Sequence, residues 1–162
     1  MGKRRDGREA AVQFLFCADV NPELAPADID TFFETIRPAK PRTREFAKIL
    51  AVGVCENRKA VDEAIEKHTD NYKLDRVSAV DRSILRLAIY EILFCEDVPN
   101  VVSINEAIEI AKRFGTEESG RFVNGILDDL HKKVRAGALN TKPEAATEQP
   151  PSSELAPENK VD

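Results

Sequence analysis

The chain has 162 residues, 42% hydrophobic and 33% charged, which suits one domain with a sizeable core. The net charge of −5 gives no overall signature of a nucleic-acid-binding protein, so such a role requires a local basic cluster. No apolar run approaches the length of a membrane span and the charged N-terminus is not a secretory signal, so we expect a cytoplasmic protein.

The first predicted helix carries basic residues at its N-terminal end. It begins at about Asp6 or Arg8 and ends at Val20. Its buried stripe consists of Ala10, Ala11, Phe14, Leu15 and Ala18, and Phe16 lies off this stripe. The basic residues are Lys3, Arg4, Arg5 and Arg8. Because the helix dipole disfavours cations there, the cluster indicates a functional use, with a solvated basic tail as the alternative.

Two further helices are predicted before the centre of the chain. A short amphipathic helix begins near Ala27 or Asp28 and ends before Pro38. Thr43 is predicted to cap a long helix that ends at about His68. No strict alternation of apolar and polar residues persists anywhere, so no strand is expected.

Residues 77–130 contain three successive helix patterns. The first is apolar on more than half of its circumference and is therefore expected to be a central helix buried on several sides. Ser78 is predicted to cap it, with Asp81 in its first turn. The second pattern begins with Ser103 and Glu106 at the spacing of a capping box and stops at Gly115.

The third pattern begins at Thr116 and ends near Val134. Gly120 and Gly125 lie inside it and each costs about 1 kcal/mol relative to Ala. We therefore expect another helix or a ligand to approach the backbone closely at both positions. After Ala136 the chain has four prolines, two lysines and five acidic residues, so residues 137–162 are predicted to be a disordered tail following a domain over residues 1–136.

The segments VDRSILRLAIYEI, DVPNVVSINEAIEIAKRFG and RFVNGIL resemble the NusB family of bacterial transcription antitermination factors. The similarity extends from about Lys3 to Val134. It implies an all-α fold of about seven helices in two packed three-helix halves. It also implies binding to single-stranded boxA RNA of ribosomal RNA leaders together with NusE, a small-subunit ribosomal protein. Other Nus factors and RNA polymerase are the implied partners in a larger complex, and some relatives form homodimers.

The resemblance also assigns roles to particular residues. Lys3, Arg4, Arg5 and Arg8 are expected to contact RNA phosphates. Phe122, flanked by Arg121 and Asn124, is a candidate for stacking on a base, with a core position as the alternative. Glu118 is expected to tune RNA affinity by repulsion. Phe16 and Asp81 match the NusE-binding surface, although Phe16 replaces an expected tyrosine.

Catalytic chemistry is not expected. The two histidines, His68 and His131, are far apart and neither has a triad-like arrangement around it. Cys17, Cys55 and Cys95 lie in apolar helical contexts and are expected to be reduced core thiols, so neither a metal nor a cofactor is predicted. Two alternatives to the NusB function remain: a detached RNA-binding domain related to ribosomal RNA methyltransferases, and a helical protein–protein adaptor without an RNA role.

Overall fold

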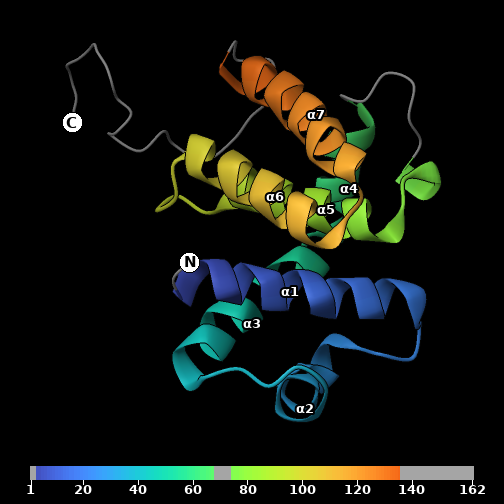
Figure 1. The fold of residues 1–162 in the computed structure, drawn as a ribbon, viewed down its shortest axis with the longest axis vertical. Coiled ribbons are helices and arrows are strands. Elements are labelled where there is room, and N and C mark those ends of the chain that lie inside the picture. The colour runs from blue at the N-terminus through green and yellow to red at the C-terminus, as the bar shows by residue number, and fades with distance from the viewer. Residues whose placement is uncertain (1–2, 68–73, 136–162) are drawn as a thin grey trace.

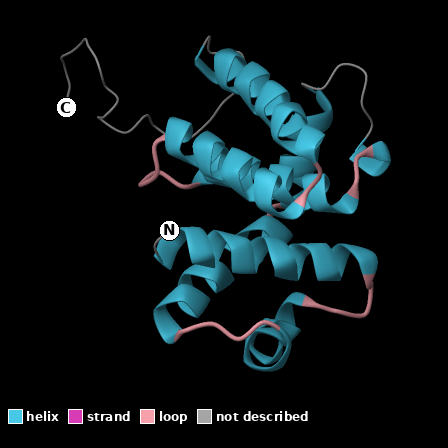
Figure 2. Ribbon diagram, viewed as in Figure 1, coloured by secondary structure: helices cyan, strands magenta, loops and turns pink. Residues whose placement is uncertain are grey.

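The computed structural model describes residues 3–67 and 74–135, and the regular structure of these residues is entirely helical (Figure 2). The α-helices are α1 (Lys3–Val20), α2 (Ile29–Thr31), α3 (Pro41–Glu56), α4 (Arg58–Lys67), α5 (Ala79–Phe94), α6 (Asn100–Phe114) and α7 (Glu117–Arg135). Three short turns accompany them: η1 (Pro26–Asp28) and η3 (Leu74–Arg76) are 3₁₀-helical, and η2 (Phe32–Ile36) is π-helical. The all-α prediction is confirmed. The predicted tail and His68 lie outside the described residues.

The helices form two packed groups (Figure 1). Helices α1, α2 and α3 make one group, and α4, α5, α6 and α7 make the other. Helix α5 contacts α1, α3, α4, α6 and α7, so it is the helix around which the two groups assemble. In the first group, the Phe14 ring packs edge-on against Phe32 with centroids 5.2 Å apart, and Phe32 packs in the same way against Phe33.

The predicted start and burial of α5 are confirmed. The Ser78 hydroxyl accepts a hydrogen bond of 3.2 Å from the backbone N–H of Asp81, as an N-cap does. Apolar side chains of α5 are buried on several sides, among them Ile84, Leu85, Leu87, Ala88, Ile89 and Ile92. Two charged residues of the same helix, Arg86 and Glu91, are also buried, and apolar periodicity gave no sign of them.

The predicted long helix from Thr43 to His68 is wrong in two respects. Helix α3 begins at Pro41 after the N-cap residue Lys40, and Thr43 is buried inside the helix. The helix then breaks at Asn57, whose side-chain Nδ2 donates a 2.8 Å hydrogen bond to the Gly53 carbonyl. That hydrogen bond caps the C-terminal end of α3, and α4 begins at Arg58, directly after Asn57.

The predicted capping box at Ser103 is also wrong. Helix α6 begins three residues earlier, at Asn100, with Pro99 in the N-cap position. The Ser103 hydroxyl instead donates a 2.9 Å hydrogen bond to Glu91 of α5, and Glu106 accepts hydrogen bonds from Arg5 of α1. Both side chains therefore join α6 to other helices. The predicted stop at Gly115 is confirmed.

The cysteines are partly buried and free, and no disulfide joins them. Burial raises the pKa of the Cys17 and Cys55 thiols, so both favour the neutral thiol. They pack at the edge of the core, together with Cys95.

Candidate RNA and partner interface

The basic segment lies within α1, because the helix begins at Lys3. The side chain of Lys3 is outside the described part of the chain. Arg8 donates hydrogen bonds of 2.8 and 2.9 Å to the two carboxylate oxygens of Glu91, and only 4% of its side chain is exposed. Burial alone would lower the pKa of Arg8, but the hydrogen bonds and charge of Glu91 outweigh burial and raise it. The expected phosphate contact of Arg8 is therefore corrected, because its guanidinium is enclosed and paired.

Arg5 joins α1 to α6. It donates hydrogen bonds of 2.8 and 2.9 Å to Glu106, and these bonds lower the pKa of the Glu106 carboxyl. A second ion pair between the same helices joins Arg113 of α6 to the buried Glu9 of α1 at 3.1 Å. The charge of Arg5 is thus largely neutralised within the protein, although 33% of its side chain remains exposed.

Arg4 is the arginine of this segment that keeps its guanidinium accessible. Its side chain is 59% exposed, and its ion pair with the exposed Asp97 is long, at 3.8 Å. The centre of its guanidinium lies 4.7 Å from the centroid of the Phe46 ring on α3. Among the three arginines predicted to contact phosphates, Arg4 therefore fits that role best.

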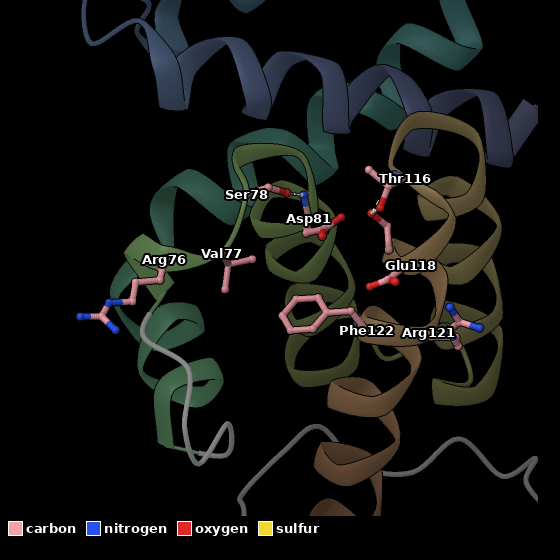
Figure 3. A pocket seen from close by; sticks show the side chains of 9 residues that line it. Arg76, Val77, Ser78, Asp81, Thr116, Glu118, Arg121 and Phe122 are labelled. Carbon is pink, nitrogen blue, oxygen red and sulfur yellow. Dashed lines mark hydrogen bonds between the residues drawn. The ribbon is translucent and has the colours of Figure 1, made fainter.

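A cavity of about 510 Å³ brings together residues that the sequence analysis had assigned to different partners (Figure 3). It lies between the start of α5 and the first turns of α7. Its lining consists of Arg76, Val77, Ser78, Asp81, Thr116, Glu118, Ser119, Arg121 and Phe122. The predicted RNA-contacting residues Glu118, Arg121 and Phe122 thus share one site with Asp81, predicted to bind NusE. Asn124 is exposed on α7 but does not line this cavity.

Asp81 gives the cavity an unusual electrostatic character. Its Oδ1 atom is buried and has no hydrogen-bond partner among the described residues. Figure 3 shows the carboxylates of Asp81 on α5 and Glu118 on α7 turned toward the gap between the two helices, whereas the guanidiniums of Arg76 and Arg121 point away from both. Because a buried carboxylate oxygen without a donor is costly, this corner of the cavity fits a hydrogen-bond donor with positive charge.

Phe122 is only partly a core residue, and its contact with an RNA base stays a prediction. It is partly buried and packs against the core, and it also lines the cavity.

The two glycines inside α7, Gly120 and Gly125, have different surroundings. A Cβ atom on Gly120 would lie 3.4 Å from Cγ of Lys112 on α6, which is an ordinary van der Waals contact and no unusually close approach. At Gly125 no described atom lies within 4 Å of that position, so the expected close approach is absent within the protein itself.

Phe16 lines a second, more apolar cavity of about 310 Å³. This cavity lies among α1, η2 and the adjoining ends of α5 and α6. Its lining consists of Val12, Gln13, Phe16, Cys17, Phe32, Ile36, Arg37, Val80 and Phe114. Phe16 is partly exposed, as expected for a residue off the buried stripe. The two predicted NusE-binding residues therefore line different cavities, and the first turn of α5 contributes Val80 to one and Asp81 to the other.

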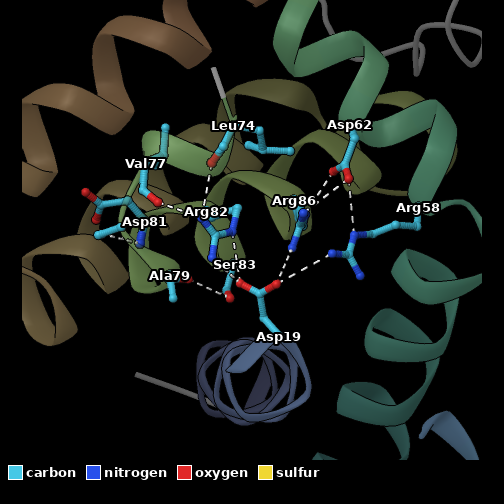
Figure 4. A network of polar contacts seen from close by, with 11 residues as sticks. Asp19, Arg58, Asp62, Leu74, Val77, Ala79, Asp81, Arg82, Ser83 and Arg86 are labelled. Atoms are coloured by element: carbon cyan, nitrogen blue, oxygen red, sulfur yellow. Dashed lines mark hydrogen bonds and ion pairs between the residues drawn. The ribbon is translucent and has the colours of Figure 1, made fainter. Parts of the chain in front are cut away.

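A network of ion pairs holds the start of α5 in place (Figure 4). Asp19, near the end of α1, accepts hydrogen bonds from Arg82 at 2.6 Å and from Arg86 at 3.3 Å. Arg82 also donates to the carbonyl oxygens of Leu74 and Val77, so it fixes the segment that forms one wall of the larger cavity. This network was not predicted from the sequence, although the spacing of Arg82 and Arg86 places them on one helix face.

The described residues contain no group of three or more histidine, cysteine or acidic side chains that could hold a metal ion. Within the described part of the chain, no helix combines the length and apolar character needed to cross a membrane.

Both the sequence and the fold of the chain are similar to those of known proteins. Residues 5–132 match the NusB family. The chain is 51% identical over 131 residues to the transcription antitermination protein NusB of Desulfatibacillum aliphaticivorans, covering 81% of this chain and 91% of that protein. Its fold is similar to a structure of NusB from T. maritima, with a TM-score of 0.72 and 39% identity over 82% of this chain and 92% of that one.

A second structural neighbour contains partners. It is a crystal structure of the antitermination factors NusB and NusE in complex with double-stranded RNA, and it matches with a TM-score of 0.72 and 26% identity. The match covers 82% of this chain and 98% of the matched chain.

Proposed function

The chain belongs to the NusB family, and from that premise we propose that it binds boxA RNA of ribosomal RNA leaders together with NusE. The bound complex joins other Nus factors on RNA polymerase and promotes processive transcription. The protein acts by binding alone, without a catalytic step. The structural neighbour that contains NusB, NusE and RNA supports this choice of partners.

The observation that carries the proposal is the cavity between α5 and α7. Asp81 offers an unpartnered carboxylate oxygen there, which suits a basic side chain of a protein partner. Phe122 offers part of an aromatic ring and Arg121 an exposed guanidinium, which suit a base and a phosphate. A partner protein and an RNA strand are thus accommodated at adjoining positions.

The remaining site residues lie outside this cavity. Phe16 in the smaller cavity supplies an apolar contact for NusE. Lys3 and Arg4 supply positive charge at the start of α1, where Arg5 is paired with Glu106 and adds only its exposed third, and Asn124 supplies a polar side chain on α7. Glu118 lowers RNA affinity by repulsion and so makes binding more dependent on the partner.

RNA binding depends on NusE because the protein itself has little unpaired positive charge at the start of α1. Because Arg8 and Arg5 are paired with Glu91 and Glu106, the protein alone contributes few phosphate contacts and binds RNA weakly. A bound partner extends the surface, and the second set of RNA contacts is then formed within one complex at high effective concentration.

The decisive experiment is a titration of labelled boxA RNA with this protein, alone and in the presence of its own NusE. We expect weak binding alone and a gain of at least tenfold with NusE, with an RNA of permuted sequence as the control. If NusE binds but the RNA affinity is unchanged, a protein–protein adaptor is the correct function. Strong RNA binding without any gain from NusE favours the domain related to ribosomal RNA methyltransferases. The sequence leaves the oligomeric state open, and light scattering of the free protein tests whether it forms a homodimer.

A further inference from the structure

The aromatic ring of Phe46 forms a platform between α3 and α1. The guanidinium centre of Arg4 lies 4.7 Å from the ring centroid, and that of Arg8 lies 5.6 Å from it. The ring also presses against the backbone of α1, because a Cβ atom on Gly7 would lie 2.6 Å from Cδ2 of Phe46. Gly7 thus allows Phe46 to pack closely enough to hold both arginines.

The two arginines beside this ring have different roles. Arg8 is enclosed and bonded to Glu91, so Phe46 adds only packing to it. Arg4 is exposed and its ion pair with Asp97, itself 72% exposed, is long. Among the described residues, the main contact that orients the Arg4 guanidinium is therefore the face of the Phe46 ring.

Such an arrangement prepares Arg4 for binding an anion. A guanidinium that stacks on an aromatic face keeps its N–H donors free in its own plane. Its long side chain has already lost rotamer freedom that binding would otherwise remove. The weak contact with Asp97 can be replaced by a phosphate, because that carboxylate is itself well solvated.

We infer that Phe46 is a positioning residue for RNA binding, which orients the Arg4 guanidinium toward a backbone phosphate of the bound strand. This inference rests on the proposed function and adds a residue of α3 to the RNA-binding surface. Phe46 itself does not contact the RNA, because its ring lies against α1 and beneath Arg4.

The test compares the affinity for boxA RNA of four variants in the presence of saturating NusE. They are Phe46→Leu, Phe46→Tyr, Arg4→Ala and the double variant with Phe46→Leu and Arg4→Ala. We expect Phe46→Leu to weaken binding about two- to fivefold, the size of an exposed cation–π contact. Phe46→Tyr keeps the ring and should retain the parent affinity. In the Arg4→Ala background, Phe46→Leu should have no further effect.

Salt dependence separates positioning from charge. Arg4→Ala should reduce the slope of log affinity against log salt by about 0.7, because one phosphate contact is lost. Phe46→Leu should leave that slope unchanged, since the positive charge remains. Phe33→Leu is the matched control for general loss of packing, because Phe33 is fully buried with Phe14 and Phe32. It should lower the melting temperature without changing RNA affinity.

The outcomes distinguish the two proposals. An equal loss from Phe46→Leu with and without Arg4 would mean that Phe46 acts through packing alone, and the positioning role is then wrong. A parent-like affinity for Phe46→Leu beside a weakened Arg4→Ala also overturns it, while the RNA role of Arg4 survives. If Arg4→Ala binds RNA like the parent although NusE still raises affinity, the Arg4 contact and its positioning both fail, but the proposed function stands.

Discussion

Arg8 of α1 and Glu91 of α5 form an ion pair with two hydrogen bonds of 2.8 and 2.9 Å across the junction of the two helix groups. Only 4% and 2% of the two side chains are exposed. Ser103 of α6 donates a third hydrogen bond to the same carboxylate, so one buried glutamate joins three helices. Arg8, which the sequence places in a basic segment predicted to bind RNA, is therefore part of the core.

Replacing Arg8 with Ala is expected to destabilise the fold by about 3–5 kcal/mol, because Glu91 then remains buried without its cationic partner. Arg4→Ala is the matched control, and it should change stability by less than about 0.5 kcal/mol since Arg4 is exposed. Urea unfolding followed by circular dichroism measures both values. A double variant with Arg8→Ala and Glu91→Ala should recover part of the loss. Equal stability of Arg8→Ala and Arg4→Ala would contradict a structural role for the pair.

The network around Asp19 predicts a pH dependence of stability. Burial alone would raise the pKa of the Asp19 carboxyl, but the hydrogen bonds and charges of Arg82 and Arg86 outweigh burial and lower it. A lowered folded-state pKa means that Asp19 stabilises the fold fully above its unfolded value of about 3.9 and loses this contribution as pH falls through the folded value.

Asp19→Asn is therefore expected to cost about 1–3 kcal/mol at pH 7, the range for hydrogen bonds to charged groups. The difference from the parent should shrink below about pH 4, because the protonated parent then resembles the variant. Urea unfolding of both proteins between pH 7 and pH 3 measures this difference, in which the titration of other carboxyls cancels. A difference that stays constant over the whole range would count against the network.

Two glycines with different surroundings provide a matched pair. A Cβ atom on Gly53 of α3 would collide with the ring of Tyr90 on α5, whereas at Gly125 of α7 that position is open. Gly53→Ala is expected to destabilise by about 1–3 kcal/mol through overpacking. Gly125→Ala is expected to stabilise by about 0.5–1 kcal/mol, because Ala favours the helix. Thermal unfolding checks both signs, and destabilisation by Gly125→Ala would reveal a neighbour at that site.

Local sequence signals were enough to predict most of the helices. Ser78 followed by an apolar run located the start of α5, and Gly115 located the end of α6. Ser103 and Glu106 have the correct spacing for a capping box, yet their side chains bond to Glu91 and Arg5 of other helices. A capping box and an interhelical bond place the same residue types at the same spacing, so tertiary contacts decided the outcome.

The candidate site was predictable only in part, for a related reason. The family resemblance indicated Asp81 and Phe122 as site residues. It could not show that both line one cavity, because this depends on how α7 packs against α5. The availability of Arg4, Arg5 and Arg8 depends on acids that are about 80 to 100 positions away in sequence. Similarly, no proline or glycine stands at the break itself, where the Asn57 side chain bonds to the carbonyl oxygen of Gly53 one turn earlier.

Charge reversal at Asp81 should separate partner binding from folding. Asp81→Lys places a cation in the first turn of α5, where the helix dipole makes it unfavourable by about 0.3–1 kcal/mol. That is small beside a domain stability of about 5–15 kcal/mol, so the variant should still fold. Glu63→Lys is the control, because this exposed residue of α4 undergoes the same charge change and lines neither cavity.

We expect Asp81→Lys to lose NusE binding, because attraction to a basic partner becomes repulsion, whereas Glu63→Lys should bind normally. Phe16→Asp should weaken the same interaction by placing a charge in the apolar cavity beside Val80. Both variants should keep native helicity and the weak RNA affinity of the free protein, but the gain in RNA affinity on adding NusE should vanish. Calorimetric titration with NusE measures the first effect and RNA binding the second. Parent-like NusE affinity in either variant removes that residue from the interface, and unfolding of Phe16→Asp would show that Phe16 serves the core instead.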